Sequence, residues 1–136
     1  MSVQLISPEG LMQPVPYHHV AVASGSRQVF VAGQVARDAG GAPSGSIDLA
    51  GQVAHALRNA HIGLTAAGAG FSDVVRMVFY VTAWTPEKIG EFMEGIESVT
   101  RELGLPFPLP PASLIGVDFL FEPDVLVEVE VTAVLD

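Results

Sequence analysis

Runs of β-forming residues begin the regular pattern of the chain. Residues 18–38, HHVAVASGSRQVFVAGQVARD, place such residues on both sides of the short segment SGSR. Gly25 and Ser26 take turn positions in that segment, so the stretch predicts a β-hairpin whose two strands belong to one sheet. Residues 38–46 are rich in Gly and Pro and predict a loop, since they lack the Lys and the spacing of a phosphate-binding P-loop.

A first amphipathic helix is predicted after this loop. Ser46 is expected to be its N-cap, with Asp48 in its first turn and Gly68 beyond its end. Its apolar stripe recurs at helical spacing and consists of Leu49, Val53, Leu57, Ala60 and Leu64. The pattern predicts a helix of roughly five turns.

A second helix is predicted after a dense β run. Residues 73–84, DVVRMVFYVTAW, are apolar on both faces, which is typical of a central strand that is covered on both sides. Thr85 is the expected N-cap of the helix and Pro86 its first residue. The apolar stripe of this helix is Ile89, Phe92, Met93, Ile96, Val99 and Leu103. The opposite side, with Glu91, Glu94 and Glu97, is expected to be a solvated face.

The last part of the chain predicts two more strands. Residues 103–111 contain four prolines, which exclude a helix or a central strand and predict an extended connector. A strand over residues 112–120 and a turn at residues 122–124 follow. In the closing strand, Val125, Val127, Val129, Val131 and Ala133 take one face, and Glu128, Glu130 and Thr132 take the other.

The order of elements predicts an α+β fold. Two strands, a helix, a strand, a second helix and two strands form a mixed β-sheet with both helices packed on one face. A length of 136 residues fits a single domain that spans residues 1–136. The second face of the sheet is both polar and apolar and has no helix to cover it. We therefore expect a homo-oligomer in which the polar residues of this face line a cavity between subunits.

Composition narrows the classes of function. A net charge of −9 repels phosphate backbones, so no nucleic-acid partner is expected. The chain has no Cys, which excludes thiol catalysis and Cys-ligated zinc. No metal site is expected among the histidines, since His18 and His19 point to opposite faces of a strand and His55 and His61 lie off a common helix face.

The beginning of the chain favours a cytoplasmic protein. The segment MSVQLISPEGLMQPVPY has neither the basic nor the continuous apolar region of a signal peptide. No stretch of the sequence is long and apolar enough to span a bilayer, so no membrane association is expected.

Several segments, taken together and in order, resemble the RidA/YjgF family of reactive-intermediate deaminases. The resemblance covers nearly the whole chain and rests on Gly33-Gln34, Gln52, Leu57, Asn59, Ala66-Ala67-Gly68, Asp73-Val74-Val75 and the terminal Glu-Val-Glu. It implies a chorismate-mutase-like fold and a homotrimer with clefts between subunits. It also implies hydrolysis of 2-imino or enamine acids to 2-oxo acids and ammonia, without metal or cofactor.

The resemblance places some site residues and leaves one missing. The family's tyrosine near the first long strand matches Tyr17, and its last-strand glutamate, which handles the attacking water, matches Glu128. The family's arginine grips the substrate carboxylate from a Pro-Ala-Arg-Ser motif, and the matching stretch here is PPASLIGV. Ala112 then stands in the position of the arginine, followed by Ser113 and Leu114. Surface positions are expected for the alternative cations Arg37 and Arg76, although either could reach a cleft.

Three hypotheses of function follow. The first is a cofactor-free hydrolase or deaminase for an imine, enamine or related metabolite other than the usual 2-imino acid. It uses Glu128 as the catalytic residue, with Tyr17, Ala112 and the backbone near Ser113 and Leu114 around the substrate. The second is a non-catalytic homotrimer that binds a small ligand. The third is an endoribonuclease, against which the acidic net charge argues.

Overall fold

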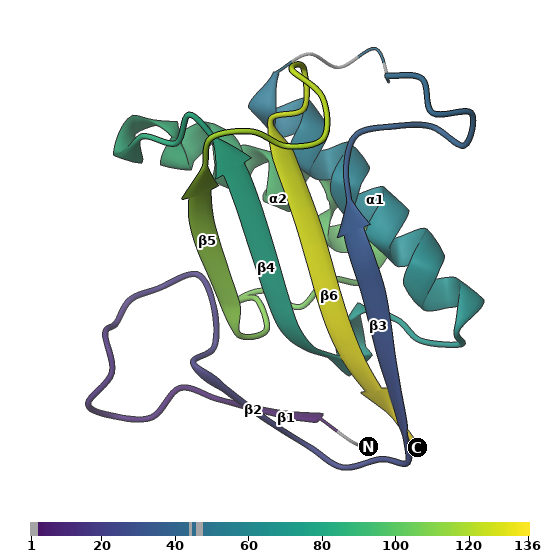
Figure 1. Cartoon of the computed structure of the whole chain (residues 1–136). Coiled ribbons are helices and arrows are strands. Elements are labelled where there is room, and N and C mark those ends of the chain that lie inside the picture. Colours follow the sequence, from purple (N-terminus) through teal and green to yellow (C-terminus); the bar gives the residue numbers. More distant parts are fainter. Residues whose placement is uncertain (1–2, 44, 46–47) are drawn as a thin grey trace.

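A mixed four-stranded sheet with two helices on one face forms the body of the protein (Figure 1). The computed structural model describes residues 3–43, 45 and 48–136. The strands follow the order β3-β6-β4-β5, where β6 is antiparallel to both of its neighbours and β4 is parallel to β5. Their bounds are Arg27–Gln34 for β3, Val74–Thr82 for β4, Ala112–Val117 for β5 and Val127–Leu135 for β6. This arrangement confirms the predicted α+β class and the mixed sheet.

The core lies between the helices and one face of the sheet. Helix α1 spans Leu49–Ala66 and helix α2 spans Ile89–Leu103. Phe79 of β4 packs edge-on against Phe92 of α2, with ring centroids 5.0 Å apart. Four residues of β6 that face the helices are at most 2% exposed, namely Val127, Val129, Val131 and Ala133. The predicted alternation of the closing strand is therefore correct.

Neither of the two helices covers the second face of the sheet (Figure 1). We call it the open face. Every second residue of β4 points to it, beginning with the exposed Arg76, whereas Met77 and Phe79 are buried under the helices. The sequence had suggested a strand covered on both sides. The internal position of β4 in the sheet is correct, but only one of its faces is covered within the chain.

The predicted hairpin around Gly25 is wrong. Strand β2, Val20–Ala23, pairs with the unpredicted β1, Val3–Ile6, in a separate two-stranded sheet, while β3 pairs with β6. Gly25 explains the difference, because a Cβ there would lie 2.2 Å from the carbonyl oxygen of Leu135. The glycine lets the backbone cross the end of β6 instead of turning back on itself.

The helix ends differ in detail from the sequence-based expectation. Asp48 is the N-cap of α1 and accepts a hydrogen bond of 2.8 Å from the backbone N–H of Gly51, whereas the expected N-cap, Ser46, lies outside the described residues. Glu91 accepts a hydrogen bond of 2.9 Å from the backbone N–H of Leu49. Glu91 therefore caps the neighbouring helix as well as facing solvent. Thr85 caps a short 3₁₀ turn, Pro86–Lys88, which precedes α2.

Within the described part of the chain, no helix combines the length and the apolar character needed to cross a membrane.

Gln52 fixes the start of β6 against α1. Its side chain is 3% exposed, donates to the carbonyl oxygen of Asp124 at 2.9 Å and accepts from the N–H of Leu126 at 2.9 Å. Gln52→Leu removes both bonds and leaves two backbone groups unpaired, so we expect a loss of about 2 kcal/mol in the free energy of unfolding. Urea denaturation measures this loss. The matched control, Gln4→Leu at an exposed position of β1, is expected to change little, and equal losses in the two variants would contradict the assignment.

Candidate functional site

A cluster of polar side chains occupies the middle of the open face. It consists of Arg76, Tyr80, Ser113, Glu128 and Glu130, which we call the polar cluster. Three adjacent strands provide these residues, because β6, β4 and β5 lie side by side and every second side chain points away from the helices. In the register of the sheet, Tyr80 lies opposite Glu128 and Val78 lies opposite both Glu130 and Ser113.

The carboxyl group of Glu128 lies directly over Gly33 of β3. A Cβ atom on Gly33 would be only 1.9 Å from Oε2 of Glu128, so the absence of a side chain gives the carboxyl its place. The register of β3 against β6 shifts between Val31 and Gln34, and this irregularity brings the glycine beneath the carboxyl. Glu128 is half-buried as a result.

The environment of Glu128 favours its protonated form. Burial raises the pKa of this carboxyl, and the neighbouring charge of Glu130 raises it further. No described residue forms a hydrogen bond with the Glu128 side chain within the chain. A half-buried carboxyl with a raised pKa and no partner is suited to accept a proton and to donate it again.

Tyr80 connects the groups of the polar cluster. Its hydroxyl donates a hydrogen bond of 2.8 Å to Oε1 of Glu130. This bond is the main cause of the raised pKa of Tyr80, followed by burial and by the charges of Glu130 and Glu128, while the charge of Arg76 opposes the shift. The four ionisable groups are therefore close enough to influence one another.

Arg76 and Ser113 form the side of the cluster that lies toward β5. Nη2 of Arg76 donates a hydrogen bond of 2.6 Å to the hydroxyl oxygen of Ser113. The ion pairs found among the described residues involve Arg37 and Arg58 but not Arg76. The guanidinium of Arg76 thus keeps donors that a ligand can use.

Comparison with known proteins gives the family. A family model described as endoribonuclease L-PSP matches residues 11–135. The chain belongs to this family, the YjgF/RidA family. No curated protein matches the sequence. The family match agrees with the resemblance drawn from the sequence.

Solved structures of YjgF/RidA proteins share the chorismate-mutase-like fold. YyfB from Yersinia pestis, a Rid family protein of unknown function, is 33% identical over 99% of this chain and 100% of its own, with a TM-score of 0.87. Rv2704 from Mycobacterium tuberculosis is 29% identical over 98% of this chain and 100% of its own, with a TM-score of 0.62. TdcF from E. coli, solved with bound serine, is 24% identical over 98% of this chain and 99% of its own, with a TM-score of 0.68, and this likeness concerns the fold alone.

Of the residues expected around a RidA site, Ser113 is the one whose side chain joins Glu128 on the open face. Ala112 lies opposite Met77 and Leu114 opposite Phe79, and both pack against the core on the helix side. Strand alternation is the reason, because position 113 is the one of residues 112–114 that points away from the helices. An arginine reaching the open face from here would have to stand at position 113 instead of 112.

Tyr17 lies away from the polar cluster within one chain. It forms a bridge with Leu109 in the connector before β5, and its ring meets His19 edge-on at 5.2 Å. Glu128 lies on β6, in the row of Tyr80 and Ile115, which is farther from this connector along β5 than Ser113 is. A contact between Tyr17 and a ligand at Glu128 therefore stays a prediction that requires a second copy of the chain.

Reasoning from the sequence had not assigned Tyr80, and it had expected Arg76 at the surface. Arg37, the other cation considered, instead binds Glu122 at 3.0 Å and Asp124 at 2.8 Å. The alternation of residues 73–84 placed Arg76 and Tyr80 on one strand face. Only the pairing of β4 with β6, however, shows that this face is the one with Glu128.

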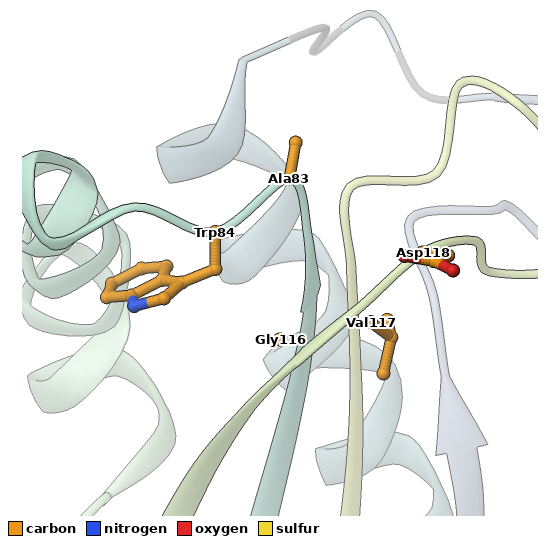
Figure 2. Close-up of a pocket in the computed structure, with 5 residues that line it drawn as sticks. All are labelled: Ala83, Trp84, Gly116, Val117 and Asp118. Atoms are coloured by element: carbon orange, nitrogen blue, oxygen red, sulfur yellow. The ribbon is translucent and has the colours of Figure 1, made fainter.

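A separate cavity of about 450 Å³ lies at the carboxyl ends of β4 and β5 (Figure 2). It is lined by Ala83, Trp84, Gly116, Val117 and Asp118. The Trp84 ring packs edge-on against that of Phe92 in α2, with ring centroids 6.0 Å apart. Among the described residues, no group of three His, Asp or Glu side chains is arranged to hold a metal ion.

Gly33→Ala tests whether the absence of a side chain at position 33 allows the Glu128 carboxyl to be half-buried. The added Cβ would overlap Oε2 of Glu128 and drive the carboxyl toward solvent. Since burial is the main cause of its raised pKa, we expect that pKa to fall toward the ordinary value of about 4.3. Titration of the side-chain carboxyl by ¹³C NMR measures it. In the control Gly90→Ala, where a Cβ meets no atom within 4 Å, the pKa of Glu128 is expected to stay raised.

The raised pKa of Glu128 also predicts how stability depends on pH. The folded protein binds this proton more tightly than the unfolded chain, so the stabilisation is complete below the unfolded pKa of about 4.3. It is lost as the pH rises through the folded pKa. Glu128→Gln stays neutral, so urea denaturation is expected to show a gain in stability over the parent at pH 8 that disappears at pH 4. A gain that is equal at both pH values would show that charge is not its cause.

Proposed function

We propose that this YjgF/RidA protein is a cofactor-free hydrolase or deaminase for a small imine, enamine or related reactive metabolite. The observation that carries the proposal is the half-buried carboxyl of Glu128, which has a raised pKa and no hydrogen-bond partner among the described residues of the chain. Such a group is suited to acid and base roles in one catalytic cycle. We place the protein in the cytoplasm.

The reaction needs one group that moves a proton twice. Glu128 as carboxylate takes a proton from water while the water oxygen forms a bond to the carbon of the C=N group, and it passes that proton to the nitrogen, which gives a neutral carbinolamine. Glu128 then takes the proton of the carbinolamine hydroxyl as the C=O bond forms, and returns it to the nitrogen as the C–N bond breaks and ammonia leaves. The sum is imine plus water giving a carbonyl compound plus ammonia. Neither a redox step nor an electron acceptor is required.

We infer that the site is completed by other copies of the chain in a homotrimer. The open face carries apolar side chains beside the polar cluster, including Phe30 at 72% exposure and Ile115 at 44%. Contact with other subunits would bury these side chains and remove water from around Glu128. A cleft between subunits would then hold the small-molecule substrate, with Tyr17 of another subunit as a candidate contact.

A second candidate function is a non-catalytic homotrimer that binds a small ligand. It is supported by the stretch PPASLIGV, which carries no arginine to hold the carboxylate of a 2-imino acid. Losing a charged hydrogen-bond partner costs about 1.5–3 kcal/mol of binding, so the usual substrate would bind poorly if nothing replaced that group. The substrate therefore differs from the usual 2-imino acid in either case.

RNA is a poor substrate for this surface, although the family model and some relatives are named endoribonucleases. The net charge is −9, and Arg76 is the one Lys or Arg on the open face. An RNA-binding surface needs several cations to neutralise phosphates.

Ammonia release tests the proposed hydrolysis. Imines are generated in place, as 2-imino acids from amino acids by an amino acid oxidase and as aldimines from primary amines by an amine oxidase. The parent is expected to accelerate ammonia release from at least one of them, and Glu128→Gln to lower that acceleration by about 10² or more. The matched control is Glu94→Gln on the exposed side of α2. Ligand binding by both the parent and Glu128→Gln, with no acceleration by either, would favour the non-catalytic alternative.

A further inference from the structure

Arg76 is the one cation on the open face whose donors are not used by a carboxylate. All six Lys and Arg residues are described. Arg37 and Arg58 form ion pairs. Of the remaining cations besides Arg76, Arg27 lies opposite the buried Leu135, on the helix side of β3, and Lys88 and Arg101 belong to helical segments. On a chain with a net charge of −9, an anionic ligand needs a local cation, and Arg76 is the group that can provide it.

Arg76 and Glu128 lie on different strands, and their side chains point to opposite sides of the polar cluster. The hydrogen bond of 2.6 Å to Ser113 holds the Arg76 guanidinium toward β5. Glu128 lies on β6 and leans the other way, over Gly33 of β3. Strand β4 separates β5 from β6, and Glu128 also lies two residues along from the row of Ser113, so the backbones of Ser113 and Glu128 are roughly 12 Å apart.

We propose that Arg76 binds an acid group of the substrate while Glu128 acts at the C=N carbon, and that these two substrate groups are several carbon atoms apart. This inference rests on the proposed function of the same site. In a 2-imino acid the carboxylate is bonded directly to the imine carbon, so it cannot contact Arg76 while its imine carbon lies at Glu128. An extended imine or enamine with a remote carboxylate can reach both groups.

The surface between Arg76 and Glu128 is suited to binding an extended substrate. Tyr80 already donates its hydroxyl proton to Glu130, which reduces the need of that carboxylate for another partner. Ile115, at 44% exposure, offers an apolar surface in the row of Glu128 and Tyr80. The planar guanidinium of Arg76 can bind a carboxylate through two parallel hydrogen bonds. Each part of an extended acid therefore has a matching group.

Three imines of six carbon atoms test the inference directly. They are 6-iminohexanoate from 6-aminohexanoate, the neutral hexan-1-imine from hexylamine, and 2-iminohexanoate from norleucine. For the parent we expect kcat/KM to be about tenfold or more higher for 6-iminohexanoate than for either of the others. In Arg76→Gln the ratio of 6-iminohexanoate to hexan-1-imine is expected to fall to about one. The control Arg101→Gln, at an exposed position of α2, is expected to keep the parent ratio.

The outcomes separate this inference from the proposed function. If Glu128-dependent hydrolysis occurs but Arg76→Gln leaves the ratio unchanged, the role of Arg76 is overturned and the hydrolase stands. If the parent hydrolyses none of the imines, the hydrolase fails, and calorimetric titration with the stable ketone 6-oxoheptanoate decides about Arg76. Binding that is about tenfold weaker in Arg76→Gln supports the anion site, and equal binding by parent and variant overturns it.

Discussion

Two different environments on the two sides of β6 determine the structure. This strand lies between β3 and β4, and its valines are buried beneath the helices. Because side chains alternate along a strand, burial of the valines obliges Glu128 and Glu130 to face the other way. A shift of one residue in the register would place carboxylates in the apolar core, at a cost of several kcal/mol for each unpaired charge. The same packing that stabilises the fold therefore holds the acidic pair in place.

Hydrophobic periodicity was sufficient to predict both helices, the sheet strands and the alternation of the closing strand. These features depend on residues close together in the sequence. Pairing between distant strands does not depend on such residues, so periodicity could not predict that β2 pairs with β1 or that Tyr80 stands opposite Glu128. The side of β5 on which Ser113 lies was equally hidden, because prolines before the strand obscure where its alternation begins.

Two features of the candidate site determine the position and the electrostatic environment of the Glu128 carboxyl. A glycine in an irregular part of β3 makes room for Glu128, and a neighbouring carboxylate that is itself bound by Tyr80 adds negative charge beside it. Of these two features, only the glycine could be recognised in the sequence, since Gly33-Gln34 is part of the family pattern. The second depends on the alignment of β4 and β6. Gln52 supports this alignment from behind, because it holds the chain on both sides of residue 125 just before β6 begins.

The loop between β5 and β6, residues 118–126, is held by ion pairs near β6 and exposes large side chains in its middle. Arg37 binds Glu122 and Asp124, while Phe119 and Phe121 remain 59% and 72% exposed. Phe121 also adopts a φ of 50°, a conformation more natural to glycine or asparagine. A loop built in this way can change its outermost residues without moving the strand that follows. Substitutions in the middle of this loop are therefore expected to leave the pairing of β6, and with it the position of Glu128, unchanged.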